Sequence, residues 1–131
     1  MSVLLDTHFW IWWLTSGSPL SARERSALDA QADRRELFLS AISLWEAQML
    51  HTKGRLQLPY PFVDWLERAA DVVSVAPLDL AVVVELDALP PSFHGDPADR
   101  LIVATARSRR LPLATRDRTI RHSRAVALWK P

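Results

Sequence analysis

The stretch SVLLDTHFWIWWL (residues 2–14) joins a short apolar run to a longer apolar segment through one acidic residue, Asp6. Residues 2–5 have the length and composition of a short buried strand. Residues 7–14 are apolar on nearly all sides, which predicts a helix covered by the core or by a partner. The stretch therefore predicts a strand followed at once by a helix, with an acid where the strand ends.

The rest of the chain repeats this alternation. Apolar runs predict further strands at 36–40, 72–76, 111–115 and 125–129. Amphipathic spacing and capping residues predict helices at 21–31, 43–52, 62–71, 79–89 and 97–110, with a short helix near 116–121. Strands separated by helices favour a parallel sheet with helices on both faces. We therefore predict a single three-layer α/β domain over residues 1–131.

Composition excludes several classes of protein. Apolar residues make up 49% of the 131 residues and six residues are tryptophan, so a disordered chain is not expected. The longest apolar run, 9–14, is far shorter than the roughly 20 residues that a membrane-spanning helix needs. The chain has no cysteine and no N-terminal signal pattern. We therefore expect an intracellular protein without disulfides, thiolate metal sites or a thiol nucleophile.

Charge is distributed unevenly, although the net charge is only +1. Residues 1–99 contain 7 Lys/Arg and 14 Asp/Glu, whereas residues 100–131 contain 9 Lys/Arg and one acid, Asp117. Most of the basic residues in the second part are arginines, whose planar donors suit phosphate groups and a polyanionic partner. A solvated basic face that balances acids elsewhere fits the charge pattern equally well.

Acidic residues occur where predicted strands end or where a helix begins. Asp6 directly follows the first strand, Glu46 lies early in the helix after the second strand, and Asp117 follows the fourth strand. Asp96 and Asp99 flank the start of the helix that begins at position 97. Ligands of open α/β sheets bind at the carboxyl ends of the strands. We therefore expect these acids to converge at one edge of the sheet.

Each acid also fits a helix cap when it is taken alone. Asp6, Asp96 and Asp117 precede predicted helices as N-caps do, and Ser43 with Glu46 matches the S-x-x-E capping box. Capping does not explain why all of them fall on one edge, where unpaired carboxylates repel one another. A hard cation such as Mg²⁺ or Mn²⁺ relieves that repulsion. The pattern favours metal-dependent hydrolysis of phosphodiester bonds.

The sequence lacks the motifs of several other chemistries and leaves two other functions open. The three glycines form neither a P-loop nor a G-x-G-x-x-G turn, and the chain has no G-x-S-x-G elbow. His94, close to Asp96, is a candidate contact for substrate or metal. One alternative is a non-catalytic α/β module that binds RNA or protein and uses its acids only as caps. The other is a Mg²⁺-dependent phosphotransfer domain, but Asp6 lacks the adjacent acid that such domains carry.

Five stretches together resemble a known family in order and spacing: LLDTHFWIWW (4–13), SAISLWE (40–46), KGRLQLP (53–59), HGDPADRLIVATAR (94–107) and LPLATRD (111–117). They are similar to the PIN-domain ribonucleases and, within these, to the VapC-type toxins of bacterial toxin–antitoxin modules. The resemblance extends over nearly the whole chain. It implies an endoribonuclease dependent on Mg²⁺ or Mn²⁺, in which a metal-activated water hydrolyses RNA to leave 5′-phosphate and 3′-hydroxyl ends.

The resemblance also implies roles for individual residues. Its catalytic and metal-binding acids match Asp6, Glu46, Asp99 and Asp117 of this chain. Within the D-P-x-D-R motif the choice of direct ligand between Asp99 and Asp96 stays open, with Asp96 as a helper or N-cap. Thr115 is implied as a supporting residue that orients Asp117 or a water molecule. We add Arg100 and Arg116 as candidate contacts to the RNA backbone.

The resemblance finally implies partners and a cellular address. The expected substrate is RNA, with tRNA and rRNA as the candidates, and the expected assembly is a homodimer. A cognate antitoxin is expected to inhibit the protein by covering the apolar helix at 9–14 and the helix at 43–49. The expected location is the bacterial cytoplasm.

Overall fold

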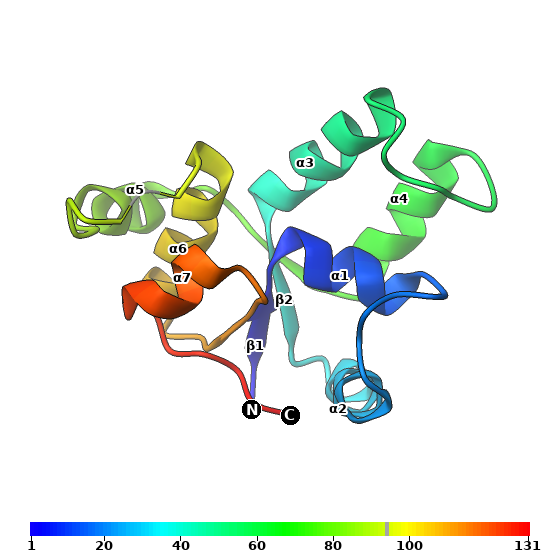
Figure 1. Ribbon diagram of the computed structural model, residues 1–131, viewed down its shortest axis with the longest axis horizontal. Coiled ribbons are helices and arrows are strands. Elements are labelled where there is room, and N and C mark those ends of the chain that lie inside the picture. Colours follow the sequence, from blue (N-terminus) through cyan, green and yellow to red (C-terminus); the bar gives the residue numbers. More distant parts are fainter. Residues whose placement is uncertain (94) are drawn as a thin grey trace.

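The computed structural model describes residues 1–93 and 95–131 and has a parallel sheet at its centre (Figure 1). The sheet has four strands in the order β3-β2-β1-β4, and every neighbouring pair is parallel. The strands are β1 (Val3–Leu5), β2 (Leu37–Ser40), β3 (Ser74–Ala76) and β4 (Leu113–Ala114). Because all strands run the same way, their carboxyl ends meet at one edge of the sheet.

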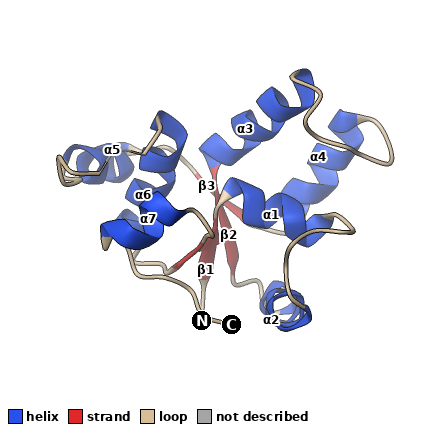
Figure 2. Ribbon diagram, in the orientation of Figure 1, coloured by secondary structure: helices blue, strands red, loops and turns tan. Residues whose placement is uncertain are grey.

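Helices cover both faces of the sheet (Figure 2). They are α1 (Thr7–Leu14), α2 (Ala22–Asp33), α3 (Ala41–Thr52), α4 (Phe62–Asp71), α5 (Leu80–Asp87), α6 (Pro97–Arg109) and α7 (Arg118–Ser123). In the view of Figure 2, α5, α6 and α7 lie on one side of the strands and α1, α2 and α4 on the other. The predicted three-layer α/β fold is confirmed. Among the described helices, none is long and apolar enough to cross a bilayer.

The central strand β1 is buried on both sides because its side chains alternate between two cores. Leu5 joins the cluster that contains Trp10 of α1 and Trp65 of α4. Leu4 joins the opposite cluster with Ile102 of α6 and Ile120 of α7. The apolar character of the helix predicted at 7–14 is therefore explained for its first part by burial in the core, whereas its last three residues are only partly buried.

Aspartate side chains cap the N-terminal ends of three of the helices. Asp6, Asp96 and Asp117 cap α1, α6 and α7, each accepting a hydrogen bond from a backbone N–H three residues on. The N–H···O distances are 2.8, 2.7 and 2.9 Å, respectively. After the last turn of α3, Gly54 adopts a left-handed φ of 68°, which suits the residue that follows a helix end.

The prediction of a regular strand at 125–129 is wrong. This segment meets the sheet at one isolated parallel bridge, between Leu113 and Leu128. Around it, Leu113 donates to the carbonyl of Ala127 (2.8 Å) and Trp129 donates to the carbonyl of Leu113 (2.9 Å). Pro112 has no N–H for a ladder, so the predicted strand 111–115 shortens to two residues and cannot support a long neighbour.

The capping box predicted for Ser43 and Glu46 is also wrong. The helix α3 begins two residues earlier than expected, directly after β2, and its N-cap is Ser40. The side chain of Ser40 accepts a hydrogen bond from the N–H of Ile42 (3.3 Å). Ser43 and Glu46 are consequently free of a capping role, and both contact Thr7 at the start of α1.

Candidate active site

A cavity of about 340 Å³ lies at the carboxyl edge of the sheet. Its walls come from α1, α3, the start of α6 and the segment between β4 and α7. The lining residues are Asp6, Thr7, His8, Trp12, Glu46, Asp96, Asp99, Ile102, Arg116 and Asp117. The structure thus brings together all five acids that the sequence placed at this edge.

The five acids are held there by local backbone structure. Asp6 and Asp117 follow β1 and β4, whose parallel pairing sets them side by side at the sheet edge. Glu46 lies one turn into α3, which continues directly from β2. Asp96 caps α6, and Asp99 lies in the first turn of that helix. Three of the acids therefore cap a helix and line the cavity at once, so the capping and site hypotheses do not exclude each other.

Burial raises the pKa of three of these carboxyl groups, those of Asp6, Glu46 and Asp99. Desolvation raises the pKa of Asp6, and the neighbouring Thr115 hydroxyl and the N–H of Phe9 partly offset the effect. Desolvation also raises the pKa of Glu46, against a lowering by the hydroxyl of Thr7. For the carboxyl groups of Asp6 and Glu46, the loss of hydration on burial therefore outweighs the hydrogen bonds that the protein donates to them.

The acidity of Asp99 is affected by all the other acids of the site. Desolvation, followed by the negative charges of Asp96, Asp117, Glu46 and Asp6, raises the pKa of Asp99 to about 7. The four other acids are thus near enough for their charge to act on this one carboxyl group. Such accumulated negative charge is typical of a site that takes a cation.

Two hydroxyl groups that sequence reasoning missed support Glu46. The hydroxyl of Thr7 donates a short hydrogen bond to Glu46 and lies 2.8 Å from the hydroxyl of Ser43. Thr7 and Ser43 are both buried. The available signals were the position of Thr7 directly after Asp6 and the spacing of Ser43 from Glu46, which was interpreted as a cap.

Thr115 supports the opposite wall. Its hydroxyl accepts a hydrogen bond from the backbone N–H of Asp117 (3.0 Å), and its side chain is buried. The contact fixes the turn by which the chain leaves β4 and enters α7. Thr115 therefore lies beside Asp6 and Asp117, and its supporting role stays a prediction.

The donor chemistry of the cavity fits a hard divalent cation. Its acidic side chains offer carboxylate oxygens, and its neutral polar neighbours offer hydroxyl groups. Mg²⁺ and Mn²⁺ prefer such oxygen ligands. In residues 1–93 and 95–131, no three His, Cys, Asp or Glu side chains lie close enough to form a ready-made ion site. Carboxylates repel one another without a counter-charge between them.

A family model described as the PIN domain matches residues 3–125. This chain belongs to the PIN-domain family. A relative named ribonuclease VapC22, from Mycobacterium tuberculosis (strain ATCC 25618 / H37Rv), is 40% identical over an alignment of 131 positions that covers 98% of each chain. The resemblance to VapC-type PIN domains is confirmed.

Solved structures share the fold of this PIN domain. VapBC2 from Rickettsia felis, bound to a DNA fragment from their promoter, gives a TM-score of 0.73 at 14% identity and covers 98% of both chains. FitAcB from Neisseria gonorrhoeae gives a TM-score of 0.72 at 24% identity and covers 98% of this chain and 96% of that one. At sequence identities this low, the structural similarity shows that the fold is shared.

The two arginines that we predict to contact RNA, Arg116 and Arg100, lie in different parts of this PIN domain. Arg116 lines the acidic cavity and forms an ion pair with Glu24 of α2. Arg100 is not among the lining residues of that cavity, and its guanidinium donates to the carbonyl of Phe93 (3.1 Å). His94, the candidate contact for substrate or metal, lies outside the described residues.

Proposed function

We propose that this protein is a metal-dependent endoribonuclease, the toxin component of a toxin–antitoxin module. The observation that carries the proposal is the convergence of carboxylates from separate elements in one cavity, with the pKa of Asp99 raised to about 7 by burial and by the other acids. Membership of the PIN-domain family and similarity to ribonuclease VapC22 support it. The complexes named VapBC2 and FitAcB have the same fold.

In this proposal the acids hold one or two Mg²⁺ or Mn²⁺ ions, through Asp6, Glu46, Asp99 and Asp117. When bound, the cation supplies activation of a water molecule and neutralisation of charge on the phosphoryl group under attack. Asp99 is a better direct ligand than Asp96, because Asp99 is half-buried and within reach of the charges of the other four acids, whereas Asp96 is exposed.

The remaining groups of the cavity position the acids and the RNA. Thr7 holds the carboxylate of Glu46 in one orientation, and Thr115 fixes the turn that carries Asp117. Arg116, on the wall of the cavity, offers a guanidinium to the phosphate backbone of RNA.

We further propose that an antitoxin segment lies along α1 and α3. A groove of about 440 Å³ runs between these helices, and it shares His8 and Trp12 with the acidic cavity. Leu50 of α3 and Leu56 of the following loop add apolar surface to it. A peptide bound in this groove would reach the acidic cavity and exclude RNA from it.

The homodimer is proposed on the outer face of α5. Leu80, Val83 and Val84 project on one side of this helix and are 78%, 51% and 58% exposed, whereas Val82 is buried against the rest of the protein. Apolar side chains at i, i+3 and i+4 form a continuous stripe on a helix. Such a stripe in water is typical of a surface that a second copy covers.

The nuclease proposal is tested by a matched cleavage assay. Purified protein, free of any co-expressed partner, is incubated with total tRNA and with rRNA in Mg²⁺, in Mn²⁺ and in EDTA. We expect discrete fragments with 5′-phosphate ends that require the metal. Asp6→Asn and Asp99→Asn should abolish them, and the exposed acid Asp64 of α4 provides the control Asp64→Asn.

Three outcomes of that assay decide between the hypotheses. Metal-dependent fragments that disappear only in the two site variants support the nuclease. Fragments that persist in Asp6→Asn and Asp99→Asn place the activity elsewhere. If folded wild-type protein binds RNA without cutting it and both site variants bind equally well, the protein is a non-catalytic binding module.

A further inference from the structure

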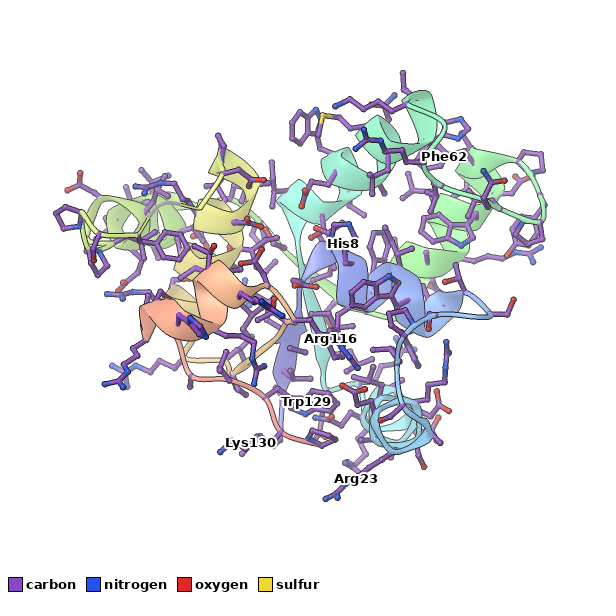
Figure 3. The ribbon with its side chains drawn as sticks, in the orientation of Figure 1. His8, Arg23, Phe62, Arg116, Trp129 and Lys130 are labelled. Carbon is purple, nitrogen blue, oxygen red and sulfur yellow. The ribbon has the colours of Figure 1, made fainter. Side chains whose placement is uncertain are left out.

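A second cavity, of about 630 Å³, lies beside the acidic one and shares Arg116 with it. Its walls are formed mainly by α7, by the residues that follow β4 and by the end of the chain. In Figure 3, Arg116 lies between His8, at the acidic cavity, and Trp129 and Lys130, at this second cavity. The two cavities are therefore neighbours with one arginine on their common wall.

The second cavity is strongly basic. Arg116, Arg118, Arg121 and Lys130 line it, and Glu24 is the acidic side chain among the lining residues. Glu24 is already paired with Arg116. Across residues 1–93 and 95–131, no carboxylate forms an ion pair with Arg118, Arg121 or Lys130. With Glu24 paired and Pro131 carrying the terminal carboxylate, the lining of the cavity keeps a net positive charge.

The aromatic residues of this cavity are poorly placed to stack on bases. Phe9 and Trp129 are only 2% and 8% exposed and pack edge to face, with ring centroids 5.8 Å apart. The guanidinium of Arg116 lies 5.9 Å from the centroid of the Phe9 ring. Stacking on a nucleobase needs an open ring face. The cavity therefore suits anionic groups rather than bases.

We propose that this basic cavity holds backbone phosphates of the RNA strand next to the bond that is cut. The proposal rests on the proposed nuclease function, since it extends the substrate path from the acidic cavity across Arg116. Phosphate contacts position a nucleic acid without reading its sequence. The cavity would thus fix the register of the strand and leave the choice of sequence to other surfaces.

The test measures RNA binding without cleavage. The probe is a fluorescein-labelled single-stranded RNA of mixed sequence, about 12 nucleotides long, and binding is followed by fluorescence anisotropy in EDTA over a range of salt concentrations. The double variant Arg118→Gln/Lys130→Gln removes two charges from the cavity. The matched control, Arg68→Gln/Arg109→Gln, removes two charges from exposed positions on α4 and α6.

The expected result follows from counterion release. Each lost phosphate contact lowers the salt slope for a single strand by about 0.7 and the affinity at about 0.1 M salt by roughly fivefold. The cavity variant should therefore bind about 25-fold more weakly than wild type, with a slope smaller by about 1.4. The control variant should lose less RNA affinity than the cavity variant, and its salt slope should change less. Thermal melts check that both variants are folded.

Two results would overturn the inference. One is RNA affinity and salt slope in the cavity variant equal to those of the control. The other is unchanged RNA binding with loss of binding to an acidic peptide, which would assign the cavity to a protein segment. Binding is measured in EDTA, where no cleavage is expected. If wild type binds RNA in EDTA but cuts none in the separate assay with Mg²⁺ or Mn²⁺, the nuclease function is contradicted and the binding result can still be interpreted by itself.

Discussion

The hydroxyl of Thr7 links the start of α1 to two residues of α3 that lie 36 and 39 positions further along the chain. It donates to Glu46 and lies 2.8 Å from the hydroxyl of Ser43. Thr7→Val keeps the shape of the side chain but removes the donor, so Glu46 loses its orientation. We expect RNA cleavage to fall about 10- to 100-fold, while Thr7→Ser keeps most of the activity. Equal activity of both variants would show that Glu46 needs no such support.

The acidity of Asp99 predicts how stability depends on pH without metal. Its pKa is raised from the ordinary value of 3.8 to about 7, so the folded chain holds this proton more tightly than the unfolded chain. This contribution is complete below about pH 4 and is lost as the pH rises through about 7. In EDTA, the free energy of unfolding in urea should therefore fall between pH 5 and pH 8.

Two comparisons sharpen this pH prediction. Asp99→Asn should flatten the decline, whereas Asp64→Asn on the exposed side of α4 should leave it in place. Added Mg²⁺ should stabilise the wild type most at the higher pH, because the cation competes with the proton for the same carboxylates. A decline that is as steep in Asp99→Asn as in wild type would contradict the assignment.

At the scale of the element, α5 has two apolar sides and only one of them is buried. Val82 packs inward, whereas Leu80 and Val84 are 78% and 58% exposed. If a second copy covers them, Leu80→Glu/Val84→Glu places charges in an apolar interface. We expect the dimer dissociation constant to rise about 30-fold or more, measured by sedimentation velocity. Val63→Glu, at an exposed valine of α4, should leave the assembly unchanged.

At the scale of the whole molecule, β1 contributes side chains to both cores, so we expect the two cores to unfold together. Leu4 and Leu5 are both fully buried but belong to different clusters, on opposite faces of the sheet. Leu4→Ala and Leu5→Ala should each lower the free energy of unfolding by about 3 kcal/mol. Tryptophan fluorescence and far-UV circular dichroism should report the same single transition in both. Separate transitions would show that the cores unfold independently.

Local signals predicted most of the elements and several residues of the site. Asp6 and Asp117 were found because they follow apolar runs, and Asp96 because it precedes a proline suited to the first helical turn. Each of these signals acts within a few residues, as hydrogen bonds of helix caps and turns do. The prediction of a strand at 125–129 was wrong because an apolar run does not reveal how many residues of the neighbouring strand are available for hydrogen-bonded pairing.

The sequence by itself determined the α/β order of elements, the acids at the strand ends and the excess of basic residues after position 99. Only the tertiary structure decided that Thr7 meets Ser43 and Glu46, and that Arg116 separates an acidic cavity from a basic one. The physical reason is that periodicity and capping depend on neighbours in the chain. Contacts across 36 residues instead follow from the parallel pairing of β1 with β2 and from the cores that hold the helices against them.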